Sequence, residues 1–143
     1  MAHWLIKSEP VKWSWDDQVK AGAEGTHWDG VRNHAAKLNL MAMRRGDQAF
    51  FYHSNEGKEI VGIAAVIREA YPDPGDPTGK FVMVDVAAVR PLEAPVTLAA
   101  VKDEPRLAEM ALIKFSRLSV QPVTDAEWAI VLEMAGEAPD GGA

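Results

Sequence analysis

Residues 48–71 read QAFFYHSNEGKEIVGIAAVIREAY, two apolar runs joined by the polar segment SNEG at positions 54–57. Aromatic and β-branched residues predominate in both runs, and Asn and Gly between them are typical of a chain reversal. We therefore predict strands over residues 48–53 and 59–71 that pair as a hairpin. Gly62 interrupts the second run, which indicates a bulge or the close approach of another backbone or a ligand.

Further strands and helices are predicted on both sides of this hairpin. A proline-rich loop over 72–77 leads to a third antiparallel strand over 81–92. Before the hairpin we expect a strand over 3–7, a helix over 15–20, a loop over 28–32 and a helix over 34–43 capped by Asn33. After it we expect helical turns from Thr97, an edge strand over 118–123 and a last helix capped by Thr124. The pattern predicts an α+β fold, with a strongly bent mixed or antiparallel sheet, or small open barrel, and peripheral helices.

Length and composition set the organisation of the chain. Its 143 residues, 48% of them hydrophobic, match one domain, which we place at 1–135, with a flexible polar tail at 136–143. Cysteine is absent, and no apolar run approaches the roughly 20 residues that span a bilayer. We expect a cytoplasmic protein, a monomer that has no membrane partner.

The net charge of −6 argues at first against a nucleic-acid partner, because phosphate binding normally needs a basic surface. The charge is unevenly distributed, however. Residues 119–143 hold five acidic and no basic residues, so the rest of the chain is nearly neutral. Composition therefore permits a nucleic-acid partner without predicting one.

Familiar catalytic and cofactor motifs are missing from the sequence. The four histidines show no H-x-x-x-H or H-E-x-x-H spacing, and neither a phosphate-binding loop nor a G-x-G-x-x-G turn is present. His53 and Ser54 could act as base and nucleophile with Asp29 or Asp85 orienting the ring, but no G-x-S-x-G motif surrounds the serine. We expect no metal and no cofactor, and favour a non-catalytic protein over an enzyme.

The five tryptophans are a better indication of function. Trp4 and Trp128 are expected in the core, and Trp13 and Trp15 flank a helix start that they could brace. Trp28 differs, since it begins the segment Trp28–Asn33 (WDGVRN). That segment suits a site that stacks a flat heterocycle and hydrogen-bonds its edge. A buried tryptophan beside an Asn-capped helix explains the same residues equally well.

Six motifs in order along the chain resemble the EVE domain, as in the thymocyte nuclear protein family. The motifs are Trp4–Pro10, Trp28–Asn33, Phe51–Asn55, Ile60–Ala64, Ala70–Pro74 and Arg117–Val123. The resemblance implies a PUA-like fold, and the order of motifs is similar to that of YTH readers of methylated adenine. It also implies a module that binds a modified, methylated or flipped base of DNA or RNA.

The resemblance further implies a pocket between Lys7–Pro10 and Trp28–Asn33, floored by the strand around Gly62. Trp28 would stack on the base, Ser8 and Asn33 would bond its edge, and Tyr71 would close the opposite wall. Base-binding residues would be Ser8, Glu9, Trp28, Asp29, Gly30, Asn33, Gly62 and Tyr71. Phosphate-binding residues would be Lys7, Arg32 and Arg117.

Individual residues and the function as a whole have alternative interpretations. Glu9 and Asp29 would accept hydrogen bonds from an exocyclic amine or simply pair with Arg32, and Tyr71 and Arg117 suit ordinary packing and surface roles. The alternative functions are an RNA- or base-processing enzyme that uses His53 and Ser54, and a protein that binds a small heterocyclic metabolite.

Overall fold

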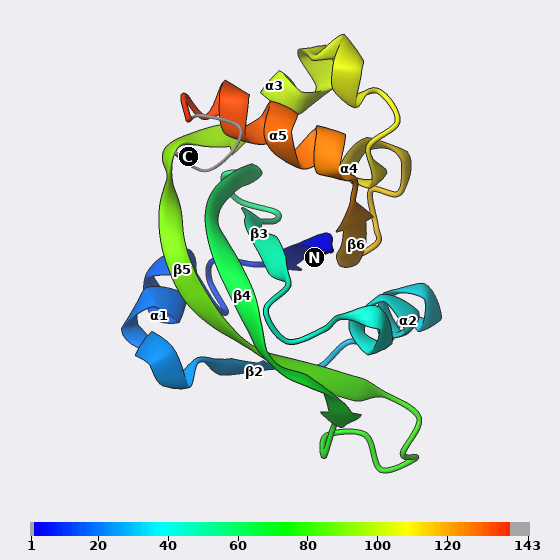
Figure 1. The fold of residues 1–143 in the computed structure, drawn as a ribbon. Coiled ribbons are helices and arrows are strands. Elements are labelled where there is room, and N and C mark those ends of the chain that lie inside the picture. Colours follow the sequence, from blue (N-terminus) through cyan, green and yellow to red (C-terminus); the bar gives the residue numbers. More distant parts are fainter. Residues whose placement is uncertain (1, 138–143) are drawn as a thin grey trace.

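A six-stranded mixed sheet with helices on both faces forms the protein in a computed structural model that describes residues 2–137 (Figure 1). The strands are β1 (His3–Ser8), β2 (Thr26–Trp28), β3 (Gln48–His53), β4 (Glu59–Pro72), β5 (Val82–Thr97) and β6 (Val120–Val123). The α-helices are α1 (Trp15–Lys20), α2 (His34–Ala42), α3 (Leu98–Asp103), α4 (Ala111–Lys114) and α5 (Asp125–Met134). Two 3-10 turns, η1 (Gly22–Glu24) and η2 (Pro105–Leu107), complete the described part.

The predicted antiparallel meander is confirmed. β3 pairs with β4 and β4 with β5, both antiparallel, and the strand order is β2-β5-β4-β3-β1-β6. β1 adds a parallel pair with β3, which makes the sheet mixed. The sheet is not closed into a barrel, in agreement with the predicted open arrangement: β2 and β6 are the two edges, and within residues 2–137 they do not pair with each other. Four register shifts between β4 and β5 bend these long strands, so the sheet curves but stays open (Figure 1).

Gly62 lies at one of these irregularities. The pairing of β4 with β3 and its pairing with β5 both shift register between Ile60 and Gly62, so both skip Val61. This agrees with the predicted bulge. A Cβ added at Gly62 would lie 2.5 Å from ring carbons of Trp15, so the group that approaches closely is an indole side chain. Glycine is required here because any side chain would displace Trp15 from the core.

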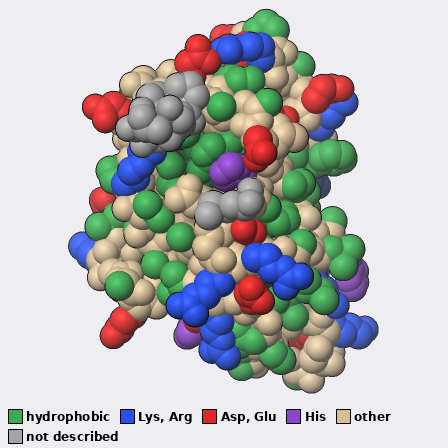
Figure 2. Space-filling view, viewed as in Figure 1, with side chains coloured by type: hydrophobic (Ala, Val, Ile, Leu, Met, Phe, Trp, Pro, Cys, Tyr) green, Lys and Arg blue, Asp and Glu red, His purple; other side chains and the backbone are tan. Residues whose placement is uncertain are grey.

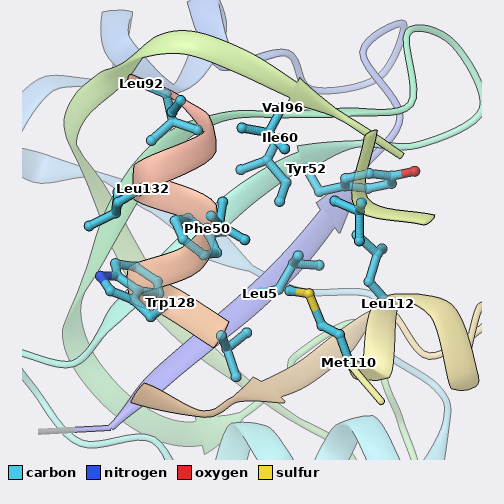
Figure 3. Close-up of a cluster of buried hydrophobic side chains, with 14 of the residues drawn as sticks. Leu5, Phe50, Tyr52, Ile60, Leu92, Val96, Met110, Leu112, Trp128 and Leu132 are labelled. Atoms are coloured by element: carbon cyan, nitrogen blue, oxygen red, sulfur yellow. The ribbon is translucent and has the colours of Figure 1, made fainter. Parts of the chain in front are cut away.

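Strand β3 is buried on both faces and supplies two separate hydrophobic clusters. Phe50 and Tyr52 point into the cluster under α3, α4 and α5 (Figure 3), where the Phe50 and Trp128 rings stack with centroids 3.8 Å apart. Phe51 points the other way, into the cluster under α1 and α2. There Trp15 and Trp28 meet its ring edge-on, with centroids at 5.3 and 5.6 Å. The second cluster therefore holds Trp28 against the sheet.

Helix boundaries follow the predicted caps closely. The side chains of Ser14, Asn33, Thr97 and Thr124 each accept a hydrogen bond from the backbone N–H three residues later, at the starts of α1, α2, α3 and α5. The predicted loop over 28–32 needs one correction, because Trp28 ends β2, which pairs antiparallel with β5. The strand is three residues long, too short to show an alternating pattern.

The C-terminal boundary also differs from the prediction. Gly136 and Glu137, assigned to the tail, are hydrogen-bonded: the Glu137 carboxylate pairs with Arg90 at 2.5 Å and accepts the Glu93 N–H at 2.7 Å. Residues 138–143 lie outside the described residues. In the described part, no helix has the length and apolar character needed to cross a bilayer.

Asp47 fastens the N-terminal strand and the end of α2 to the sheet. Its carboxylate, 4% exposed, accepts hydrogen bonds from the Trp4 indole N–H at 3.0 Å, the Arg44 N–H at 3.0 Å and the Ala2 N–H at 3.2 Å. Burial alone raises the pKa of this carboxyl, but the three donors outweigh it and hold the pKa below its usual value.

We predict that Asp47→Asn lowers the free energy of unfolding by about 1 to 3 kcal/mol at pH 7, because a buried charged acceptor is lost. Since the folded pKa is depressed, the contribution of Asp47 is complete above the unfolded pKa of about 3.9 and is lost as pH falls through the folded pKa. Urea unfolding should show the gap between wild type and variant closing in acid. Asp103→Asn, an exposed position at the end of α3, is the control. A gap that is the same at pH 7 and in acid would contradict this account.

Candidate functional site

A cavity of about 530 Å³ opens between the end of β1 and the segment that joins β2 to α2. Its size is that of ordinary small-ligand pockets. The residues that line it are Lys7, Ser8, Glu9, Lys12, Trp13, Thr26, His27, Trp28, Asp29, Gly30, Val31, Arg32, Asn33 and Ser119. The structure thus brings together eight of the eleven predicted site residues, from two segments distant in sequence.

Trp28 forms one wall and is largely buried, with 8% of its surface exposed. Its edge-on contact with Phe51 fixes the indole against the sheet, while the residue still borders the cavity. The two sequence-based interpretations of Trp28 are therefore compatible. It is a buried residue beside a helix that Asn33 caps, and it also faces open space.

Trp13 is a second indole in the lining. From the sequence it is expected only to brace a helix start, so its place at the cavity is a finding of the structure. It is half-buried, and its indole N–H donates to Gln18 Oε1 at 2.8 Å. Gln18 is completely buried and its amide donates in turn to the Val86 carbonyl at 3.2 Å. The Ser8 hydroxyl donates to the Trp13 carbonyl at 2.5 Å. Trp13 is thus held by its ring and by its backbone.

Asp73 is the residue that fixes the other side of the cavity. It lies at the start of the β4–β5 connection, is 3% exposed, and its Oδ2 accepts the Gly30 N–H at 2.9 Å and Arg32 Nη1 at 3.0 Å. Its Oδ1 accepts the Gly75 N–H at 2.8 Å. Burial raises the pKa of this carboxyl, but the bonds from Gly30, Arg32 and Gly75 outweigh burial and keep the pKa low.

The contact with Asp73 also explains the glycine at position 30. Gly30 has φ of 76°, the left-handed region that other residues rarely adopt, and this conformation accompanies its N–H bond to Asp73. Arg32 packs with its guanidinium carbon 5.5 Å from the centre of the ring of Phe81, the last residue of the same connection. The segment that carries Asp29 to Asn33 is therefore anchored from the β4–β5 hairpin.

The charged residues of the lining differ in their freedom to meet a ligand. Arg32 pairs with Asp73, so its predicted pairing with Glu9 or Asp29 is not observed. Glu9 pairs instead with Lys12 at 3.1 Å and accepts a hydrogen bond from Asn55. Within residues 2–137, no side chain pairs with the Asp29 carboxylate, which is exposed at the cavity. Asp29 is thus the available carboxylate of the lining.

Lys7 is a half-buried cation at the cavity. Its ammonium donates to the Ser116 carbonyl at 2.6 Å, and burial lowers its pKa. Two of the neutral polar side chains keep capacity for a ligand. Asn33 Oδ1 accepts the Ala36 N–H and leaves the amide N–H₂ free, while the Ser8 oxygen keeps its lone pairs.

Three predicted site residues do not line the cavity. Gly62 packs against Trp15, as described above, and Arg117 is exposed outside the lining. Tyr71 donates to the Asp85 carboxylate at 2.5 Å and lies 2.8 Å from Nδ1 of His27, which itself belongs to the lining. Burial and the adjacent Asp85 raise the pKa of Tyr71 to about 12. Tyr71 therefore lies behind the cavity wall.

The residues of the alternative hydrolytic site are not brought together. His53 Nε2 accepts the Trp15 N–H at 3.0 Å, and neither His53 nor Ser54 lines the cavity. Asp85 bonds to His27 at 2.9 Å instead. Among the described residues there is no group of three or more His, Asp and Glu side chains suited to a metal ion.

Positive charge reaches the cavity through Lys7, Lys12 and Arg32. Figure 2 shows Lys and Arg gathered around an acidic side chain in the lower half of the face that it presents. The protein therefore has local basic regions on an acidic background.

Comparison with known proteins agrees with this architecture. The sequence profile of the EVE domain matches residues 2–134. Thymocyte nuclear protein 1 of Gallus gallus is 38% identical over 169 residues, with 96% of this chain and 70% of the relative covered. An NMR structure of a Rhodopseudomonas palustris protein is 70% identical, with a TM-score of 0.91 and coverage of 95% and 94% of the two chains.

A further solved structure is that of human THYN1 protein in complex with DNA containing 5-methylcytosine. It is 36% identical to this chain, with a TM-score of 0.91, and the alignment covers 97% of this chain and 100% of the human one. This likeness confirms the PUA-like α+β fold expected from the sequence.

The expected similarity to YTH readers is confirmed at the level of fold. The YTH domain of Zygosaccharomyces rouxii MRB1 protein, solved in complex with N6-methyladenosine RNA, has a TM-score of 0.56 and 17% identity, over 96% of this chain and 88% of that one. Profile, identity and fold lead to the same conclusion, and the chain belongs to the EVE domain family.

Proposed function

We propose that this protein is a binding module that captures a modified base of a nucleic acid in its cavity. The observation that carries the proposal is the pair of indoles, Trp13 and Trp28, on the wall of a 530 Å³ cavity that also holds unpaired polar groups. The relative solved with 5-methylcytosine DNA supports a methylated base as the ligand.

Free energies favour two indoles over one. Turning a base out of a helix costs a few kcal/mol, and stacking on one aromatic ring returns about 1 to 3 kcal/mol. A single tryptophan would only balance the extrusion. A second indole lining the same cavity supplies the additional stacking free energy that net binding requires. A methyl group in an apolar niche adds about 1 to 3 kcal/mol, so the modification biases binding and does not switch it completely.

The polar groups favour a base that carries an exocyclic amine. The free carboxylate of Asp29 can accept from such an amine, and the Asn33 amide can donate to a neighbouring ring nitrogen or carbonyl. Glu9 is occupied by Lys12 and Asn55, which leaves Asp29 as the acceptor for the amine. Cytosine and adenine both present this pair of groups.

Cations near the mouth would hold the phosphates on either side of the captured nucleotide. Arg117, exposed two residues before Ser119, has no carboxylate partner within residues 2–137. Lys7, Lys12 and Arg32 belong to the lining, and any phosphate contact they make would add to their bonds with Ser116, Glu9 and Asp73. Phosphate contacts release counterions, so they make affinity depend on salt concentration. A small heterocyclic metabolite would show no such dependence.

We predict that Trp13→Ala weakens binding of a 5-methylcytosine oligonucleotide by roughly 5- to 150-fold, because one stacking surface is lost. Trp13→Phe keeps an aromatic face and should retain most of the affinity. Fluorescence anisotropy measures both, and thermal unfolding verifies that each variant is folded. Val11→Ala, exposed and outside the lining, is the matched control. Equal affinities of wild type and Trp13→Ala would exclude the stacking role.

We also predict that Arg117→Ala reduces the slope of log affinity against log salt by about 0.7 to 0.9, the contribution of one phosphate contact. The exposed Lys102 on α3 lies outside the lining, so Lys102→Ala should leave the slope unchanged. Titrations at several salt concentrations give both slopes. A wild-type slope near zero would contradict the nucleic-acid proposal and favour a small metabolite.

A further inference from the structure

Phe115, just after α4, places an aromatic ring in solvent beside the cavity. It is 61% exposed, and it is the one aromatic residue among the exposed large hydrophobics of residues 2–137. Single exposed apolar residues are common and usually need no explanation. Three features of its surroundings distinguish Phe115 from such residues.

The first feature is a rigid backbone. Gln121 in β6 is completely buried, and its amide donates to the carbonyls of Leu118 at 2.9 Å, Phe115 at 3.2 Å and Ala111 at 3.4 Å. The Leu118 N–H also donates to the Phe115 carbonyl at 2.9 Å. The exposure of the ring therefore does not result from a loose loop, because the segment beneath it is fixed from the interior.

The second feature is a direct connection to the cavity. The ammonium of Lys7 donates to the Ser116 carbonyl at 2.6 Å, and the Lys7 N–H donates to the Ser119 carbonyl at 3.0 Å. Lys7 and Ser119 both line the cavity. The segment from Phe115 to Ser119 is thus bonded to Lys7 and reaches the cavity at Ser119.

The third feature is the charge on either side of the ring. Lys114 precedes Phe115 and Arg117 follows it two residues later. Lys114 pairs with Glu109 at 2.7 Å, whereas Arg117 has no carboxylate partner within residues 2–137. The exposed aromatic ring offers a face on which a base can stack, and the free cation beside it offers a contact for the adjacent phosphate.

From these features, and resting on the proposed function, we infer that Phe115 is a wedge for duplex nucleic acid. When the modified base leaves the duplex for the cavity, the two neighbouring base pairs lose their stacking partner. The Phe115 ring enters the vacated space and stacks on them, as apolar wedges do in proteins that unstack base steps. Arg117 meets the adjacent phosphate. A single strand leaves no such gap, so the wedge acts on duplexes alone.

The test compares two substrates that share one modified strand: the 5-methylcytosine strand alone and the same strand in a duplex. Phe115→Ala should weaken duplex binding by roughly 5- to 150-fold, the size of one stacking contact. Single-strand binding should change less than twofold, because a single strand leaves no gap between base pairs for the ring to fill. Phe115→Trp should restore duplex affinity. Val89→Ala, another exposed apolar position outside the lining, is the control. Since the ring is exposed, none of these variants should alter the thermal unfolding midpoint.

Outcomes separate the wedge from the proposed function. Unchanged duplex affinity of Phe115→Ala, or an equal loss on both substrates, overturns the wedge while leaving capture by Trp13 and Trp28 intact. Wild-type protein that binds neither substrate better than its unmodified counterpart overturns the proposed function, and the wedge with it.

Discussion

Burial of β3 on both of its faces is the constraint on which the rest of the structure depends. Ala49, Phe50, Phe51 and Tyr52 are all buried, so consecutive side chains must be covered by different sets of helices. The cluster built on Phe50 is closed by α3, α4 and α5, and makes a conventional core. The cluster built on Phe51 includes Trp15 and Trp28, and the proposed binding cavity lies at its margin. The folded core and the proposed ligand capture thus depend on the same cluster.

Local signals in the sequence predicted most of the fold. The caps at Asn33 and Thr124 and the two apolar strands around the SNEG turn depend on neighbouring residues, and all were found where expected. Pairing between distant segments was harder. The sequence shows no hydrophobic periodicity that would indicate the parallel pairing of β1 with β3 or the short strand β2. Both depend on contacts with strands that are distant in the chain.

In the candidate site, too, residues marked by their neighbours were predicted and residues whose roles depend on distant contacts were not. The Trp28–Asn33 segment was identified because its residues are unusual neighbours in the chain. Asp73 and Trp13 were not, since their roles come from contacts across the fold: Asp73 bonds to Gly30 and Arg32, and Trp13 is oriented by the buried Gln18. The proline-rich loop around Asp73 looked like a simple connection. Its one buried carboxylate makes it a support for the cavity.

Asn33 caps a helix and lines the cavity, and it uses different atoms of its side chain for the two roles. Its side-chain oxygen caps α2 by accepting the Ala36 N–H, while its amide N–H₂ keeps its donors for a ligand in the cavity. Aspartate and serine begin helices as well as asparagine does. Aspartate would preserve the helix but replace the amide donor by an acceptor, and serine would preserve it with a shorter hydroxyl in place of the amide. Under the proposed function, one codon change at this position would therefore alter the groups offered to the base without weakening the helix.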